Sequence, residues 1–167
     1  VHVIDELDAR HIDRFIVLGH SMGGMIAQEI ARKHPQQVER LVLYGTGPLG
    51  SMPDRFEPLE VSLERLDRDG VAETARRITA TWFVDGARHP SHAAIHEIAA
   101  MADPVAARAA LLAMAAWDGR PHMTALEMPT LILWGDRDRS YRWPQVEALW
   151  RHLPNVSLAV IPGASHA

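Results

Sequence analysis

Short apolar runs and amphipathic segments alternate along this chain of 167 residues, a pattern typical of an α/β protein. Four runs are almost wholly apolar, which predicts strands of a parallel sheet covered on both faces. These strands are predicted over residues 14–18, 41–44, 130–134 and 156–161. Helical spacing of apolar residues over 25–31 and 144–153 predicts a helix after the first strand and another before the last. Ile4 and Leu7 indicate a further amphipathic helix at the start.

The middle of the chain has helical periodicity throughout. Four helices are predicted there, over residues 56–69, 70–83, 90–102 and 103–117. The last has a clear start signal, because Asp103 can act as N-cap and Pro104 takes the first helical position. We therefore divide the chain into two sheet-forming segments, 1–48 and 123–167, and an all-helical insertion over 49–122.

The first predicted strand ends in Gly19-His20-Ser21-Met22-Gly23, a G-x-S-x-G turn that leads directly into a helix. Such a break leaves its middle residue at the apex of a strained turn, and the two glycines let strand and helix approach each other. Ser21 would stand there as a nucleophile. The N–H of Met22, at the helix N-terminus, would hold a developing negative charge as one half of an oxyanion hole. The alternative is a glycine-rich turn with an N-capping serine.

This turn resembles the nucleophile elbow of the α/β-hydrolase superfamily, and the resemblance covers essentially the whole chain. It implies a mostly parallel sheet, a helical cap over the nucleophile, and a triad in the chain order serine, acid, histidine. The strand over 130–134 runs into a Gly-Asp-Arg-Asp turn, so two carboxylates compete for the role of the acid. The family's G-x-x-D pattern selects Asp138, and Asp136 is then a turn-stabilising residue.

The base is expected in the loop after the last strand, whose Gly-Ala-Ser-His sequence resembles the family's G-x-x-H ending. His166 would take the proton of Ser21 while Asp138 orients its ring. His20 is the sequence neighbour of the serine, but the tight turn should point it elsewhere, to pack against nearby loops.

The cap of such hydrolases forms part of the substrate pocket, and the all-helical insertion has the size of a cap. Five bulky residues are candidates for the pocket wall: Trp82, Phe83, Met101, Met114 and Trp117. For each of them the alternative is that it simply packs the cap helices against one another.

Serine at the apex argues against the dehalogenase and epoxide-hydrolase branches, which use a carboxylate there. Residues 20–28 and 80–83 most resemble 3-oxoadipate enol-lactonase-like enzymes and small carboxylesterases. The resemblance implies hydrolysis of an ester or lactone of a small carboxylic acid. C–C bond hydrolases of ring-fission products are the alternative, although they usually have Asn before the serine and Trp after the histidine, where this chain has His20 and Ala167. A non-catalytic binding member of the fold is a further alternative.

The chain opens at Val1 and resembles the C-terminal two-thirds of such a hydrolase, so we expect a fragment that lacks the N-terminal strands. In the family the absent part donates the second oxyanion-hole N–H. The strand over 14–18 would then have one unpaired apolar edge, which favours self-association and an incomplete enzyme.

Composition restricts partners and compartment. The formal net charge is −4 and arginines are scattered, so no nucleic-acid surface is expected. No apolar run approaches the ~18 residues of a membrane span. With no cysteine and no signal-like start, we expect a soluble, cytoplasmic protein. The oligomeric state is left open.

No cofactor or metal is expected. Residues 45–50 satisfy G-x-G-x-x-G, but residues 51–54 extend the turn where a dinucleotide site needs a helix. His92 and His96, four apart on a predicted helix, could in principle bind a metal. No third ligand has suitable spacing, so a solvated helix face is the favoured interpretation. The expected partner is a small ester or lactone.

Overall fold

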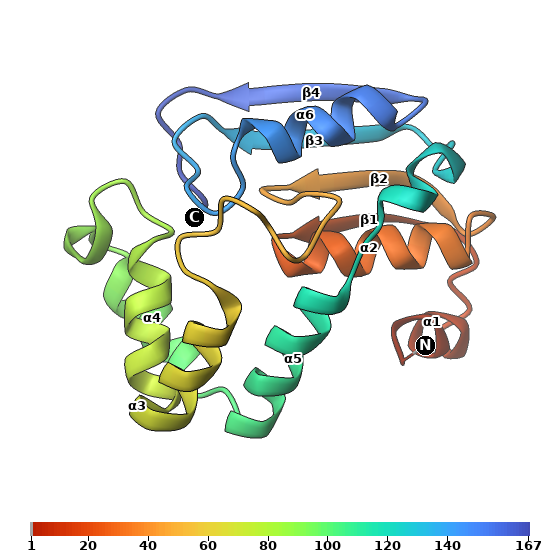
Figure 1. The fold of residues 1–167 in the computed structure, drawn as a ribbon. Coiled ribbons are helices and arrows are strands. Elements are labelled where there is room, and N and C mark those ends of the chain that lie inside the picture. Colours follow the sequence, from red (N-terminus) through yellow and green to blue (C-terminus); the bar gives the residue numbers. More distant parts are fainter. Residues whose placement is uncertain (1) are drawn as a thin grey trace.

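A four-stranded parallel sheet organises the computed structural model, which describes residues 2–167 (Figure 1). The strands are β1 (Phe15–His20), β2 (Val38–Tyr44), β3 (Thr130–Gly135) and β4 (Val156–Ile161), in the order β1-β2-β3-β4. This confirms the predicted α/β class with a parallel sheet. β2 begins earlier than predicted, because Glu39 and Arg40 interrupt its apolar pattern although their backbones belong to the strand.

Two helices, α2 (Met22–Lys33) and α6 (Trp143–His152), lie over the same face of the sheet (Figure 1). The main core forms between them and the strands. Its fully buried members are Ala31, Leu41, Leu43, Val146 and Leu149, with Ala27 and Ile132 almost as enclosed. The helix α1 (His2–Ala9) lies beyond the β1 edge and buries Ile4.

The insertion is helical, as predicted, and contains α3 (Leu59–Ala80), η1 (Gly86–Arg88), α4 (His92–Ala100) and α5 (Pro104–Ala116). A break inside α3 falls at Gly70, whose φ of 79° and ψ of 176° are not helical, and this matches the predicted boundary between two helices. Asp103 caps α5 by accepting a hydrogen bond from the Ala106 N–H at 2.9 Å. A short helix, η2 (Arg120–Ala125), leads back to β3.

The two ends of the insertion meet. Leu49 and Asp118 form an isolated antiparallel bridge. Beside it, the Gly50 N–H donates to the Trp117 carbonyl at 3.0 Å, and the Gly119 N–H donates to the Pro48 carbonyl at 2.9 Å. We call this the neck of the cap. It lies close to the boundaries proposed after residues 48 and 122, and the three-part division remains our interpretation.

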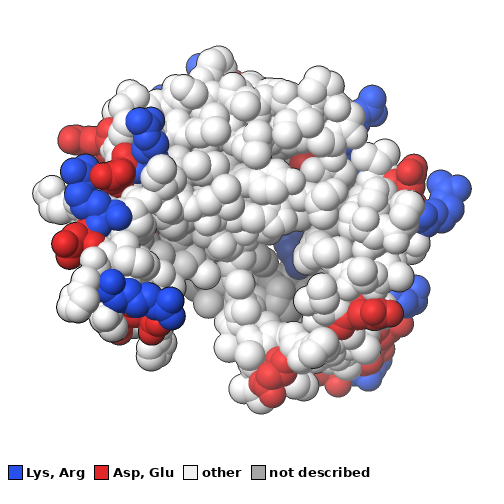
Figure 2. Space-filling view, turned by 180° about the vertical axis from the view of Figure 1, so that it is seen from behind, with Lys and Arg blue, Asp and Glu red and all other residues white. Residues whose placement is uncertain are grey.

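The opposite face of the sheet differs from the expectation of cover on both sides. Within residues 2–167, Ile16 is 58% exposed and Leu18 is 61% exposed on β1, which pairs with β2 alone. The register places Leu18 beside Val42, and Val42 beside Leu131. Figure 2, seen from this side, shows a broad central surface almost free of charged side chains.

Within the described residues, no single helix is both long and apolar enough to cross a bilayer. The pair α4 and α5 reaches that length and composition together, but the two helices are bent by 103° at their junction.

The exposed β1 strand generates a prediction for the 167-residue chain expressed alone. It should self-associate, because an apolar edge strand offers unpaired backbone groups to a second chain. Leu18→Lys should lower the average mass measured by size-exclusion chromatography with light scattering. The control Ile98→Lys changes a side chain that is 68% exposed on α4, outside the sheet, and should not change the mass. A monomeric wild-type chain would contradict this prediction.

Candidate active site

Ser21 occupies the sharp turn between β1 and α2 with a φ of 55° and a ψ of −123°. A positive φ is unfavourable for a residue with a Cβ, so the surrounding contacts must hold it. The Ser21 N–H donates to the Tyr44 carbonyl at 3.0 Å, which extends the β1–β2 ladder. The Thr46 hydroxyl donates to the Ser21 carbonyl at 2.7 Å. Both ends of the strained peptide are therefore anchored to β2 and to the loop that follows it.

The close approach of strand and helix depends on glycines. A Cβ at Gly19 would overlap the carbonyl of Gly23, as the motif predicts. A Cβ at Gly23 would meet nothing within 4 Å, so the expectation that this second glycine must lack a side chain for the close approach is wrong. Gly24 is the second crowded position, because its Cβ would overlap the Thr46 side chain. The motif alone did not identify that constraint.

The structure pairs His166 with Asp138. The two side chains are 1% exposed each, and Nδ1 of the histidine lies 2.9 Å from Oδ2 of the aspartate. The other carboxylate oxygen accepts the N–H groups of Ser140 at 2.7 Å and Tyr141 at 3.0 Å. A carboxylate with these partners acts as an acceptor only, so Nδ1 carries the proton and Nε2 is left without one, as an acceptor.

Asp136 has a different task. Its carboxylate accepts the Gly163 N–H at 2.7 Å and stays exposed at the surface. That bond joins the turn after β3 to the turn after β4, so Asp136 stabilises the loop that carries His166 without contacting the ring.

The His166 loop is held from two sides. The His20 Nε2–H donates to the His166 carbonyl at 2.9 Å, and the two rings lie 4.6 Å apart. The Ala167 N–H donates to the Trp82 carbonyl at 3.0 Å, which connects the loop to the cap. His20 thus contacts the histidine loop directly, and its burial, with His166 beside it, lowers its pKa.

Ser21 and His166 line one cavity of about 180 Å³ between the sheet edge and the cap. Nε2 of His166 is buried and has no hydrogen-bond partner among the described residues. Met22, which also lines this cavity, is the first residue of α2, where backbone N–H groups lack intrahelical acceptors. Ser21, Met22 and His166, whose Nε2 is unpartnered, therefore line the same space.

Comparison with known proteins agrees with this geometry. The family Hydrolase_4, described as serine aminopeptidase, S33, matches residues 1–167. The chain belongs to this family. A pimeloyl-[acyl-carrier protein] methyl ester esterase of Aromatoleum aromaticum is 30% identical over 170 residues, covering 93% of this chain and 68% of the relative.

Two further matches come from other hydrolases. A 2-hydroxy-6-oxo-6-phenylhexa-2,4-dienoate hydrolase of Burkholderia cepacia is 25% identical over 179 residues, covering 96% of this chain and 59% of that protein. The solved enol-lactonase of Burkholderia xenovorans LB400 shares the fold with a TM-score of 0.85 and 23% identity, over 99% of this chain and 63% of that one. The chain spans about 60% of the length of the first curated relatives that it matches.

Of the five residues expected at the pocket of this Hydrolase_4 chain, the structure brings Trp82 and Met114 to the cavity with Ser21. Phe83 is buried, only 2% exposed, and stacks on His89 inside the cap. Met101 is 84% exposed at the end of α4. The periodic pattern identified helix faces, but not which of them turns toward the cavity.

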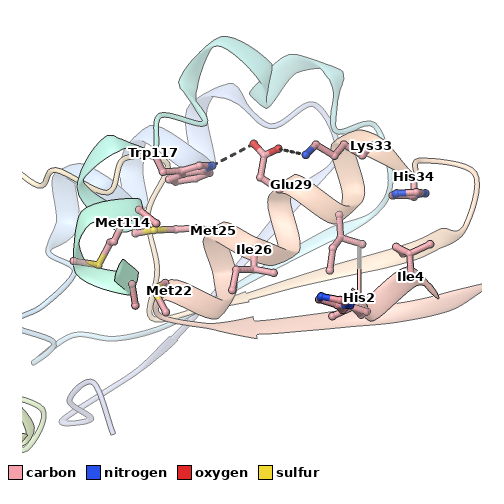
Figure 3. Close-up of a pocket in the computed structure, with 14 residues that line it drawn as sticks. His2, Ile4, Met22, Met25, Ile26, Glu29, Lys33, His34, Met114 and Trp117 are labelled. Carbon is pink, nitrogen blue, oxygen red and sulfur yellow. Dashed lines mark hydrogen bonds and ion pairs between the residues drawn. The ribbon is translucent and has the colours of Figure 1, made fainter. Parts of the chain in front are cut away.

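Trp117 lines a second, larger cavity of about 500 Å³ between α1, α2 and α5 (Figure 3). Its indole N–H donates to Glu29 at 3.2 Å, and Lys33 approaches the same carboxylate at 3.8 Å. Met22 and Met114 line both cavities, so these two side chains separate the large apolar space from the one at the serine.

Several residues of the cavity were not identified from the sequence, among them Tyr141 and Arg55. The Tyr141 ring stacks on His166 with the ring centres 5.6 Å apart, and Tyr141 lines the cavity together with Ser21. Burial raises the pKa of this phenol to about 12, so it is a neutral donor at physiological pH. The sequence offered one signal for Tyr141: it lies three residues after Asp138, and residues of that turn lie near the carboxylate.

The loop after β2 has its own role. Gly45 has a φ of 49°, and a Cβ there would lie 3.2 Å from Nδ1 of His166 and 3.3 Å from Oδ2 of Asp138. A side chain at this position would press on the bond between these two groups. The first glycine of the G-x-G-x-x-G segment thus serves the histidine–aspartate pair.

The helix face with His92 and His96 is not solvated as expected. His92 is 6% exposed, and its Nε2 lies 3.2 Å from the Thr79 hydroxyl and 3.3 Å from the Arg76 carbonyl. It fastens α4 to α3, and Nδ1 of His96 is also buried. Across residues 2–167 there is no group of three or more His, Cys, Asp or Glu side chains placed to hold a metal ion.

The raised pKa of Tyr141 generates a prediction for stability. Between about pH 10 and 12 the unfolded phenol ionises while the folded one stays protonated, so the free energy of unfolding falls as the pH rises through this window. The loss should reach about 2–3 kcal/mol, measured by urea unfolding at each pH. Tyr141→Phe should lose this part of the slope, and Tyr44→Phe should keep it. Equal slopes in both variants would contradict the assignment.

Proposed function

We propose that this protein is a serine hydrolase that cleaves an ester or lactone of a small carboxylic acid through an acyl-enzyme. One observation carries the proposal: the strained Ser21 shares a cavity with the unpartnered Nε2 of a buried histidine whose other nitrogen is bound to Asp138. The strained backbone of Ser21 and the unsatisfied buried Nε2 of His166 both lower stability, and a catalytic role for the two residues would explain why they are present.

The proposed reaction has two halves. Nε2 of His166 takes the Ser21 proton as the oxygen attacks the carbonyl carbon, and the Met22 N–H binds the resulting oxyanion. The intermediate collapses, the acyl–oxygen bond breaks, and His166 returns the proton to the leaving alcohol. Water then attacks the acyl-enzyme with His166 again as the base, which releases the carboxylic acid and restores Ser21. Asp138 stabilises the imidazolium in both halves.

Nε2 of His166 has no hydrogen-bond partner among the described residues, so the Ser21 hydroxyl does not yet point at it, although both side chains line one cavity. The hydroxyl therefore has to turn toward Nε2 before it attacks, which a side-chain rotation allows. Catalytic hydrogen bonds are often long or differently paired without substrate.

C–C bond hydrolysis is the second candidate, and it is supported by the relative of Burkholderia cepacia, named as a dienoate hydrolase. It would use the same serine and histidine. The presence of His20 rather than Asn and of Ala167 rather than Trp, noted in the sequence, favours the ester or lactone substrate. A panel of esters, lactones and vinylogous 1,5-diketones measured side by side separates the two reactions.

The test of the nucleophile uses the full-length protein. Ser21→Ala should abolish labelling by a fluorophosphonate probe and lower ester turnover by about 10⁴–10⁶, because the attacking oxygen is removed. Ser140→Ala is the matched control, since Ser140 is the other serine that lines this cavity, and it should still be labelled. Circular dichroism checks that both variants fold. Unchanged labelling of Ser21→Ala would rule out the proposed role and favour a non-catalytic member of the fold.

A further inference from the structure

The cavity at Ser21 is asymmetric in charge. Among the described residues that line it, Arg55 is the only Lys or Arg, and no Asp or Glu lines it. The rest of the wall is mostly apolar, with Phe56, Ile78 and Leu111 among its members. Arg55 also lines a second cavity, together with Glu57 and Glu60. A guanidinium that lines a mostly apolar cavity is partly removed from water, and an anion bound in that cavity would compensate its charge.

Arg55 is held in place by one side of its guanidinium. A single terminal nitrogen donates to the Glu57 carbonyl at 2.6 Å and to the Ser62 hydroxyl at 2.9 Å. The guanidinium carbon lies 4.7 Å from the centre of the Phe56 ring. These contacts fix the direction of the side chain and leave its remaining N–H donors for another partner.

The nearest carboxylate is engaged with other residues. Glu57 accepts a hydrogen bond from Arg77 at 2.6 Å, lies 3.6 Å from Arg65, and also accepts from the Ser62 hydroxyl. Within residues 2–167, no Asp or Glu comes within ion-pair distance of Arg55. Burial lowers the pKa of Arg55, which reflects a charge that water solvates only partly.

We propose that Arg55 is the anion-binding residue of the substrate site and that the substrate carries a carboxylate close to its scissile ester or lactone bond. The inference rests on the proposed hydrolase function and narrows it. Arginine suits this task because its planar fork binds a carboxylate through two parallel hydrogen bonds. Tyr141, a neutral phenol in the same cavity, adds no repulsion to a bound anion.

The size of the cavity limits the substrate further. About 180 Å³ holds a short chain, and Met22 and Met114 form an apolar wall beside the serine. A monoester of a short dicarboxylic acid, or a lactone with a carboxylate arm, matches one cation at one end and Ser21 at the other. Hydrolysis creates a second carboxylate in a cavity with one cation, and the repulsion between the two charges favours product release.

The test compares two esters of equal length with the full-length protein. Monoethyl glutarate carries the carboxylate, and the ethyl ester of glutaramic acid replaces it by a neutral amide. Proton release in a pH-stat gives kcat/KM for each. We expect the carboxylate to be preferred at least about tenfold, mainly through KM, and the preference to shrink as NaCl is raised. Equal values for the two esters would overturn the anion site.

Variants assign the preference to Arg55. Arg55→Gln should reduce the ratio of the two kcat/KM values to near one, and Arg55→Lys should keep part of it, because the charge remains but the fork is lost. Arg76→Gln is the matched control: it removes the same charge from an exposed position of α3 and should leave the ratio unchanged. A folded Arg55→Gln variant that keeps the full ratio would overturn the assignment. Should Arg55→Gln fail to fold, the ratio in Arg55→Lys decides.

This failure differs from failure of the proposed function. If neither ester is hydrolysed and the fluorophosphonate does not label Ser21, the hydrolase proposal is wrong, and the anion site falls with it. If Ser21 is labelled and the ester with the neutral amide is hydrolysed as fast as the ester with the carboxylate, the hydrolase proposal stands. Arg55 then has only a structural role in the cap.

Discussion

Three glycines at the carboxyl ends of adjacent strands allow this site to exist. A Cβ at Gly19 would overlap the first turn of α2, one at Gly45 would press on the histidine–aspartate pair, and one at Gly135 would overlap the Ala164 carbonyl in the loop after β4. A Cβ at Gly19 or Gly135 would meet backbone atoms, and one at Gly45 would meet the side chains of His166 and Asp138. The loops that carry Ser21 and His166 converge because nothing projects between them.

The same region concentrates costs that the rest of the fold must offset. A serine with positive φ costs on the order of 1–3 kcal/mol. A buried carboxylate is tolerable only because two backbone N–H groups and the His166 ring satisfy it. The core between α2, α6 and the strands lies directly below and is densely apolar. A rigid core of this kind can hold a strained edge without relaxing it.

The sequence was sufficient for elements whose signal is local. The strand over 156–161 and the break at Gly70 coincide with the structure, and the Asp103 cap forms as predicted. The elbow motif, Asp138 and His166 could also be placed from local signals, because each follows the end of a predicted strand. The carboxyl ends of parallel strands meet at the same edge of the sheet.

What the sequence could not provide depends on how distant faces meet. Phe83, Met101 and Met114 were equal candidates for the pocket wall in the sequence, but of these three the packing of the cap brings only Met114 to the cavity with Ser21. Arg55 lies in an irregular loop, where no periodicity indicates which way a side chain points. Tyr141 follows Asp138 closely, yet its stacking on His166 depends on where the loop after the neighbouring strand β4 runs.

The neck of the cap has a consequence for how such a chain can change over time. Because Leu49 and Asp118 already lie side by side, the segment between them begins and ends at one point of the molecule. The pairing of β2 with β3 therefore does not depend on the length or the fold of that segment. Helices can be lengthened, lost or exchanged between these two residues while the machinery at the strand ends stays in register. The helical segment and the strand ends of this chain can therefore evolve at different rates.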